Sequence, residues 1–287
     1  MLQSISRRNV LKTAASAAGV LGVSHPFGFT LPAAQPKASF KQGVARWCYN
    51  KIPLDGFARA AADMGIRGVD LVGPEDWPTL KKYGLVCSIT SGGGSIADGL
   101  NRKENHEKIE QEFRQNIPRA AAAGVPNVIT FSGNRKGLSD EEGIENCIIG
   151  LNRVKGLAER HGVTICLELL NSKVNHKDYQ CDHTAWGVEV VKRVNSPRVT
   201  LLYDIYHMQI MEGDVIATIR ANKDWIGHYH TGGVPGRHEI DDSQELNYPA
   251  IMRAIAETGF AGFVSHEFVP TRDPLASLRE AVRLCTV

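Results

Sequence analysis

The sequence of 287 residues lacks the patterns that mark several large classes of protein. No apolar run after residue 40 approaches the roughly 20 residues of a membrane-spanning helix, so we expect no membrane span there. No cluster of Lys and Arg with interleaved aromatic residues is present, which argues against a nucleic acid partner. The six cysteines form no Cys-x-x-Cys pair and suggest no disulfide framework, so we expect unpaired thiols.

Short apolar runs alternate with longer amphipathic segments from residue 43 onward. The runs are rich in Val, Ile and Leu, as expected of parallel strands that helices cover. They predict eight strands, at residues 44–49, 68–72, 85–90, 127–131, 163–169, 199–204, 226–230 and 262–267. No Gly-rich dinucleotide fingerprint follows the first strand, so the pattern favours a single α/β domain of the closed (β/α)8 type, a TIM barrel, over an open doubly wound sheet.

Amphipathic segments between these strands predict helices at residues 54–64, 103–123, 141–160, 185–194, 215–222, 248–258 and 275–284. Glycines fall where helices should end in the left-handed conformation, at Gly65, Gly84, Gly124, Gly162 and Gly259. Two helix starts are also marked, because Ser139 opens a capping box and Asp273 precedes Pro274 as an N-cap.

A glycine-rich segment, Ser-Gly-Gly-Gly-Ser at residues 91–95, follows the third predicted strand. It lacks both the Lys-Ser/Thr ending of a phosphate-binding loop and the spacing of a dinucleotide fingerprint. We therefore favour a flexible loop at the active face of the barrel over a phosphate site.

The first 35 residues differ in composition from the rest of the chain. Arg7 and Arg8 precede an Ala/Gly-rich apolar run at residues 13–23, with small residues at 33–34. This order fits a secretory signal, and the paired arginines resemble a twin-arginine export signal. We predict a signal over residues 1–35, a barrel over residues 36–287 and a periplasmic or otherwise exported protein. A disordered basic tail is the alternative.

Loss of this leader would change the net charge of the chain. Residues 1–34 contain three cations and no acidic residue, so their removal shifts the formal charge from +2 to −1. A nearly neutral chain exerts no long-range attraction on nucleic acid or anionic lipid. We expect no nucleic acid partner. Barrels of this type often associate, and a homo-oligomer is compatible with the sequence, although no interface signature is present.

Four metal-capable side chains stand at the ends of the last four predicted strands: Glu168, Asp204, His230 and Glu267. A TIM barrel builds its active site at the carboxyl ends of its strands, so these side chains are expected to converge. Carboxylate oxygens suit Mg²⁺ or Mn²⁺, and one imidazole shifts the preference toward Mn²⁺. Each residue taken alone has an ordinary explanation, such as a salt bridge or a helix cap. The joint pattern predicts one divalent-metal site.

Several motifs resemble the hydroxypyruvate isomerase family, which belongs to the xylose-isomerase-like TIM barrels together with ketose 3-epimerases. They are Leu-Glu-Leu-Leu-Asn at residues 167–171, Tyr-Asp-Ile-Tyr-His-Met-Gln-Ile-Met-Glu-Gly-Asp at 203–214, Val-Pro-Gly-Arg-His-Glu at 234–239 and Asn-Tyr-Pro at 247–249. The similarity covers about residues 43–270. One departure is His230, because relatives that isomerise hydroxypyruvate tend to have Gln there and epimerases have His.

The resemblance implies roles for individual residues. Glu168, Asp204, His230 and Glu267 would hold the metal, and the two glutamates would also carry protons on opposite sides of the substrate. His207 and Arg237 would bind substrate oxygens; their alternatives are a packed loop histidine and a surface cation paired with Glu239. Two further residues are expected beside the substrate, Asn171 from its motif and Trp47 because aromatic residues often wall sugar sites, with core packing as the alternative for Trp47.

These roles describe a metal-dependent isomerase or epimerase of a small hydroxy-keto acid or keto-sugar. One glutamate would remove the proton beside the carbonyl to give a cis-enediolate, and reprotonation would complete isomerisation or epimerisation. A lyase or dehydratase is an alternative, because the same intermediate can expel a β-substituent. A non-catalytic sugar-binding barrel and a related barrel that cuts DNA at abasic sites are others; the near-neutral charge argues against the last.

Overall fold

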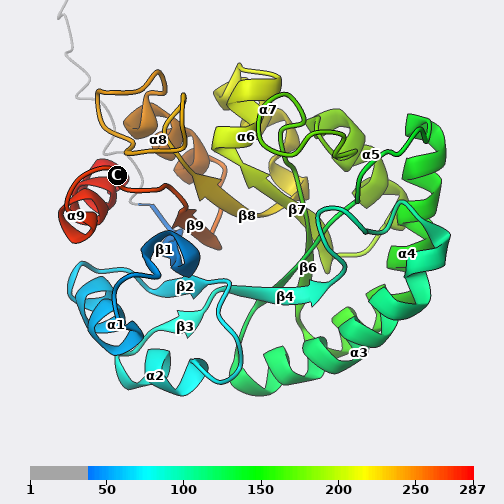
Figure 1. Ribbon diagram of the computed structural model, residues 1–287, viewed down its shortest axis with the longest axis horizontal. Helices are drawn as coiled ribbons and strands as arrows, with labels where there is room; N and C mark the ends of the chain where they lie inside the picture. The colour runs from blue at the N-terminus through cyan, green and yellow to red at the C-terminus, as the bar shows by residue number, and fades with distance from the viewer. Residues whose placement is uncertain (1–37) are drawn as a thin grey trace, which may run out of the picture. The chain divides into compact units, whose positions relative to one another are not determined.

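The structure is a computed structural model that describes residues 38–287, and Figure 1 shows a single barrel of strands with helices around it. All strand pairs are parallel, in the order β3-β2-β1-β9-β8-β7-β6-β5-β4. The nine strands of the described part are Lys41–Ala45 (β1), Gly68–Asp70 (β2), Val86–Cys87 (β3), Ile89–Gly93 (β4), Asn127–Thr130 (β5), Thr164–Glu168 (β6), Val199–Asp204 (β7), Ile226–Thr231 (β8) and Phe263–His266 (β9). The predicted TIM barrel is confirmed.

The barrel closes through the third predicted strand, which the structure divides into β3 and β4. Segment β3 pairs with β2, and β4 pairs with β5. Across the division, the backbone N–H of Ser88 donates to Val69 O at 3.2 Å and that of Leu71 donates to Ile89 O at 2.9 Å. The ends of the sheet therefore meet within one continuous segment, and the eight predicted strands appear as nine.

Helices form the outer layer of the barrel in Figure 1. Their bounds are Leu54–Asp63 (α1), Trp77–Lys82 (α2), His106–Ala123 (α3), Asp140–His161 (α4), Thr184–Val194 (α5), Ile205–Met211 (α6), Val215–Asn222 (α7), Tyr248–Glu257 (α8) and Pro274–Leu284 (α9). The five glycines predicted to end helices all have positive φ, and the side chains of Ser139 and Asp273 cap α4 and α9 as expected. Helices α2 and α6 were not predicted.

Two local expectations need correction. The first strand ends at Ala45 rather than Tyr49, so Trp47 lies in the short 3₁₀ helix Arg46–Tyr49 that follows it. The glycine-rich segment is not a flexible loop, because Gly92 and Gly93 belong to β4. A Cβ at Gly93 would lie 2.9 Å from the backbone oxygen of Ile109 in α3, so glycine lets that helix approach the strand.

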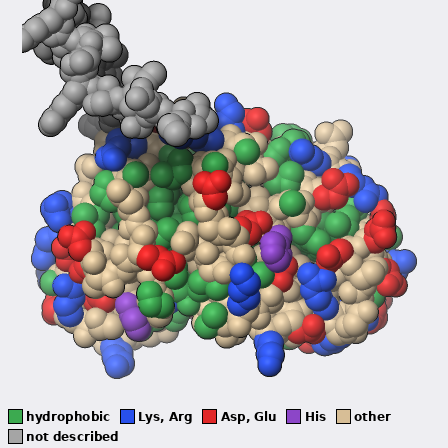
Figure 2. Space-filling view, turned by 90° about the horizontal axis from the view of Figure 1, so that it is seen from above, with side chains coloured by type: hydrophobic (Ala, Val, Ile, Leu, Met, Phe, Trp, Pro, Cys, Tyr) green, Lys and Arg blue, Asp and Glu red, His purple; other side chains and the backbone are tan. Residues whose placement is uncertain are grey.

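The six cysteines, all within the described part, are free thiols, as expected. Among residues 38–287 no helix is both long and apolar enough to cross a bilayer. Basic and acidic side chains are interspersed over the face shown in Figure 2. The signal expected over residues 1–35 lies outside the described residues and stays a prediction.

Candidate metal centre

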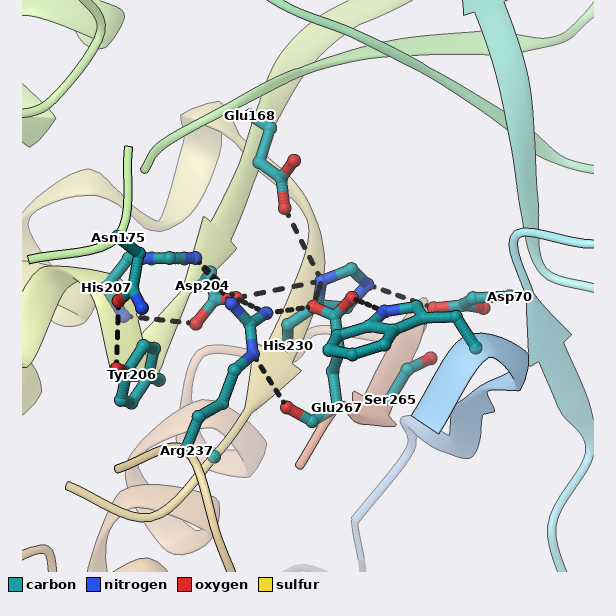
Figure 3. A network of polar contacts seen from close by, with 12 residues as sticks. Asp70, Glu168, Asn175, Asp204, Tyr206, His207, His230, Arg237, Ser265 and Glu267 are labelled. Atoms are coloured by element: carbon teal, nitrogen blue, oxygen red, sulfur yellow. Dashed lines mark hydrogen bonds and ion pairs between the residues drawn. The ribbon is translucent and has the colours of Figure 1, made fainter. Parts of the chain in front are cut away.

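The four predicted ligands converge at the carboxyl end of the barrel (Figure 3). Glu168 and Asp204 are the last residues of β6 and β7, His230 lies near the end of β8, and Glu267 directly follows β9. One ligand atom of each lies within 4.8 Å of those of the others. All four side chains are buried, with 0–6% of each residue exposed. The structure thus brings together the set that the sequence predicted.

The imidazole of His230 presents Nδ1 to the three carboxylates. This nitrogen lies 2.6 Å from Glu267 Oε2, 3.6 Å from Glu168 Oε1 and 3.9 Å from Asp204 Oδ2. It is buried and has no hydrogen-bond partner of acceptable geometry among the described residues. Burial opposes protonation of this ring, but the surrounding carboxylates, Glu267 above all, hold the pKa of His230 well above its ordinary value, and a cation bound by the lone pair of Nδ1 would take the place of that proton. Three carboxylates and this nitrogen fit Mn²⁺ or Mg²⁺ as a donor set.

The two glutamates differ in electrostatic environment. Burial raises the pKa of Glu168 to about 7, and the neighbouring charge of Glu267 adds to this effect. Burial also disfavours ionisation of Glu267, but Arg237 and His230 outweigh it and hold its pKa well below the ordinary value. Burial raises the pKa of Asp204 despite the opposing charge of Arg237. Three carboxylates so close together therefore need positive charge to ionise jointly.

Arg237 supplies positive charge from the loop between β8 and α8. Its Nη2 donates to Asp204 Oδ2 at 2.8 Å and to Glu267 Oε2 at 2.5 Å, and its Nε donates to the backbone oxygen of Glu267 at 3.1 Å. The guanidinium lies 5.6 Å from the ring centre of Trp47 and 5.1 Å from that of Tyr206. Arg237 is therefore part of the site, and the alternative of a surface cation paired with Glu239 is wrong.

Trp47 lies at the edge of the same cluster. Its indole N–H donates to Glu267 Oε1, while 41% of the residue is exposed. It is therefore not a core residue, and its ring lies beside Arg237; the expected contact of Trp47 with substrate stays a prediction.

His207 lies in the first turn of α6 rather than in a loop. Its backbone N–H donates to Asp204 Oδ1 at 3.1 Å, and its ring is fully buried. The backbone N–H of Asn171 lies 3.1 Å from His207 Nδ1 and Nη1 of Arg237 lies 2.7 Å from Nε2, so both ring nitrogens face donors and a neutral ring can accept from only one of them. Burial, reinforced by Arg237, keeps the pKa of His207 well below its ordinary value, so the ring is neutral.

Asn171 is fully buried and supports its neighbours. Its Oδ1 accepts from the backbone N–H groups of Val174 and Asn175 at 3.0 and 2.9 Å. Its Nδ2 lies 2.8 Å from Asn175 Oδ1 and 2.6 Å from His207 Nδ1. The amide is thus engaged by the chain itself. The expected contact of Asn171 with substrate stays a prediction, whereas its contact with His207 is a feature of the structure.

Sequence reasoning missed Asp70, the last residue of β2. Its side chain is fully buried, and its Oδ2 accepts from His228 Nε2 at 2.8 Å and from His230 Nε2 at 3.1 Å. Burial opposes ionisation of Asp70, but the two histidines outweigh it and keep its pKa below the ordinary value. Asp70 lies two residues before the end of the predicted strand 68–72, so the strand-end criterion did not select it; a carboxylate inside an apolar strand was the signal that could have found it.

Comparison with known proteins agrees with the fold and the motifs. Residues 58–286 match the family model described as xylose isomerase-like TIM barrel. A curated relative from Drosophila melanogaster, named "Putative hydroxypyruvate isomerase", is 37% identical over 223 residues, which are 74% of this chain and 84% of the relative. A 2-oxo-tetronate isomerase from Cupriavidus necator is 29% identical over 244 residues, 78% of this chain and 90% of the relative.

A solved structure gives the same fold. The crystal structure of an AP endonuclease, family 2, from Brucella melitensis matches with a TM-score of 0.74 and 27% identity. The match covers 83% of this chain and 97% of that one.

Proposed function

The chain belongs to the xylose isomerase-like TIM barrel family, and from this premise we propose that it is a divalent-metal-dependent isomerase or epimerase of a small hydroxy-keto acid or keto-sugar. The observation that carries the proposal is the convergence of Glu168, Asp204, His230 and Glu267 within 4.8 Å. The curated relatives from Drosophila and Cupriavidus are named as isomerases, which supports the same class of reaction.

The two glutamates supply the proton chemistry in this proposal. A bound Mn²⁺ or Mg²⁺ would polarise the carbonyl and the adjacent hydroxyl of the substrate. One glutamate removes the proton from the hydroxyl-bearing carbon, and a cis-enediolate forms. Delivery of a proton to the neighbouring carbon gives isomerisation, and delivery to the opposite face of the same carbon gives epimerisation. Trp47 and Arg237 orient Glu267 by binding one carboxylate oxygen each.

Arg237 and His207 provide donors for the oxygens of the substrate. Arg237 Nη1 lies 2.7 Å from His207 Nε2, and when the ring accepts from the backbone N–H of Asn171 at Nδ1, both of these atoms carry hydrogens. A substrate hydroxyl or carbonyl oxygen that accepts from both would relieve this juxtaposition. Nη2 and Nε of Arg237 already bind Asp204 and Glu267.

Proton exchange with solvent tests the reaction class. Protein loaded with Mn²⁺ is incubated in D₂O with hydroxypyruvate, a 2-oxo-tetronate and ketohexoses, and the products are followed by NMR. We expect deuterium at the carbon beside the carbonyl together with an isomerised or epimerised product. Loss of a β-substituent would favour the lyase alternative.

Matched variants separate catalysis from mere binding. Glu168→Gln and Glu267→Gln should abolish deuterium exchange while the barrel stays folded. Glu110→Gln, in an exposed i,i+4 pair with Arg114 on α3, should leave exchange unchanged. A sugar-binding barrel without catalysis would show no exchange in any form of the protein. Cleavage of an abasic DNA duplex that depends on the same glutamates would replace the isomerase proposal.

We further propose that the protein is exported through the paired arginines Arg7 and Arg8. Fractionation of cells that express the full chain should place the mature barrel outside the cytoplasm. Replacement of both arginines by lysine keeps the charge and should retain the protein in the cytoplasm. If the native protein and the lysine variant are divided in the same way between the cytoplasm and the exported fraction, export by this route is contradicted.

A further inference from the structure

Asp70 faces the side of the His230 ring that is turned away from the metal-capable cluster (Figure 3). It is paired in register with Ala45 of β1, and its side chain is fully buried. Its Oδ1 accepts from the hydroxyl of Ser88, and its Oδ2 accepts from both His228 and His230. Asp70 thus holds one nitrogen of the ring whose other nitrogen belongs to the candidate metal centre.

The position of the ring proton follows from these contacts. A carboxylate only accepts hydrogen bonds, so the 3.1 Å contact with Asp70 Oδ2 places a proton on Nε2 of His230. The lone pair that binds a cation must then be on Nδ1, the atom that faces Glu168, Asp204 and Glu267. The opposite tautomer would leave a buried carboxylate facing a lone pair, which is unfavourable.

We infer that Asp70 is a positioning residue that keeps the proton of His230 on Nε2 and directs Nδ1 at the metal. The inference rests on the proposed function, because it requires His230 to be a ligand. A second hydrogen bond of this kind fixes the orientation and tautomer of a ligating histidine and raises its basicity. Asp70 itself does not touch the cation or the substrate in this arrangement.

The surrounding strands make room for this network. Gly43 of β1 and Gly68 of β2 are paired in register. A Cβ at Gly68 would overlap the Ser88 hydroxyl, and a Cβ at Gly43 would overlap the hydroxyl of Ser265. Ser265 Oγ lies 3.3 Å from His228 Nε2. The two glycines therefore leave room for the hydroxyls of Ser88 and Ser265 at this level of the barrel.

A second metal site is the competing interpretation. One ligand atom each of Asp70, His228 and His230 also lie within 4.8 Å of one another. The groups already bind each other, since Asp70 accepts from both rings and from Ser88, and Asn127 Nδ2 lies 3.4 Å from His228 Nδ1. We therefore expect one Mn²⁺ per chain, bound on the Nδ1 side of His230.

Calorimetric titration with Mn²⁺ tests the inference on the full barrel. Asp70→Leu keeps the approximate size and removes the acceptor, and we expect it to raise the Kd for Mn²⁺ by about 10–100-fold. Ser196→Ala removes a serine hydrogen bond to another carboxylate, Glu159, in the segment before β7, and its Kd should remain at the native value. Asp70→Asn retains one acceptor oxygen, so we expect it to lose less affinity for Mn²⁺ than Asp70→Leu. This variant replaces Asp70→Leu in the test if the leucine variant does not fold.

Nitrogen-15 NMR of the native protein reads the tautomer directly. In protein loaded with Zn²⁺ as a diamagnetic probe, the His230 signals, assigned by their loss in His230→Leu, should show a proton on Nε2 and coordination through Nδ1. A proton on Nδ1, two Mn²⁺ per chain, or native affinity in Asp70→Leu would overturn the inference. If the native protein binds no Mn²⁺, or if His230→Leu binds it equally well, the proposed function itself fails.

Discussion

Asp204 Oδ1 accepts a hydrogen bond from the backbone N–H of His207 at 3.1 Å, so one carboxylate caps helix α6 and also supplies an oxygen to the candidate metal centre. The cap ties the position of the His207 ring to the carboxyl end of β7. The candidate ligand Asp204 and the proposed substrate donor His207 are thus only three residues apart in the chain. Their spacing follows from helix geometry rather than from long-range packing.

Substitutions at Asp204 should separate the two roles. Asp204→Asn keeps a good N-cap but loses the charge that pairs with Arg237, so we expect Mn²⁺ affinity to fall by at least tenfold, about 1.4 kcal/mol. Asp204→Ala should lose affinity similarly and should be less stable than Asp204→Asn by about 1 kcal/mol, because it also loses the cap. Titration calorimetry and thermal unfolding measure the two effects. Equal stability of the two variants would show that the cap contributes nothing.

Trp47 should matter through its indole N–H as well as through its ring. Trp47→Phe keeps the aromatic wall beside Arg237 but removes the donor to Glu267 Oε1. We expect kcat/KM to fall by about tenfold, because the contribution of a hydrogen bond to a charged group is about 1.5 kcal/mol. Trp77→Phe is the control, since its indole donates to the backbone oxygen of Val72 instead. An unchanged kcat/KM in Trp47→Phe would reduce Trp47 to a passive wall.

The sequence predicted the four candidate ligands because the periodicity of the strands locates their carboxyl ends. Parallel strands end at the same edge of a barrel, so side chains at the ends of the predicted strands share one site. Glu168, Asp204, His230 and Glu267 satisfied that rule, and the structure places them together. Asp70 lies in a strand of only three residues whose carboxyl end was predicted two residues too late, which hid it among apolar neighbours.

Other features depend on contacts that periodicity does not carry. Helix α6 begins directly after β7, so its apolar residues read as a continuation of the strand and loop. The place of Arg237 depends on a loop that turns through positive φ at Gly236 and at Arg237 itself. The motif Val-Pro-Gly-Arg-His-Glu at residues 234–239 implied a substrate-binding role for Arg237. Only the structure shows that its guanidinium lies between the carboxylates of Asp204 and Glu267.

Arg237 should stabilise the metal-free protein. Arg237→Met removes the cation that Asp204 and Glu267 share, so we expect the free energy of unfolding to fall by about 3–5 kcal/mol. Addition of Mn²⁺ should raise the Tm of this variant more than that of the native protein, because it restores positive charge beside the carboxylates. Arg114→Met removes an exposed partner of Glu110 and is the control. Equal Tm shifts in Arg237→Met and native protein would contradict this role.

Glu239 should stabilise the loop that carries Arg237 in a pH-dependent manner. Its Oε1 accepts from the backbone N–H of Thr271 and from Ser277 Oγ, both at 2.8 Å, and its Oε2 accepts from Thr271 Oγ1 at 2.9 Å. Burial opposes ionisation, but these hydrogen bonds outweigh it and lower the pKa of Glu239 to about 2. The folded state thus releases this proton more readily than the unfolded state does.

The sign of the pH effect follows from that difference. The stabilisation by Glu239 is complete above the unfolded pKa of about 4.5 and is lost as the pH falls toward about 2. The lowering of the Glu239 pKa in the folded state corresponds to a contribution of about 3 kcal/mol to the free energy of unfolding. Chemical unfolding of native protein and Glu239→Gln between pH 7 and pH 2.5 should give a stability difference that shrinks steadily below pH 4.5. Asp242→Asn removes an exposed carboxylate from the same segment and should give no such trend. A difference between native protein and Glu239→Gln that does not vary with pH would mean that Glu239 acts through packing rather than through its charge.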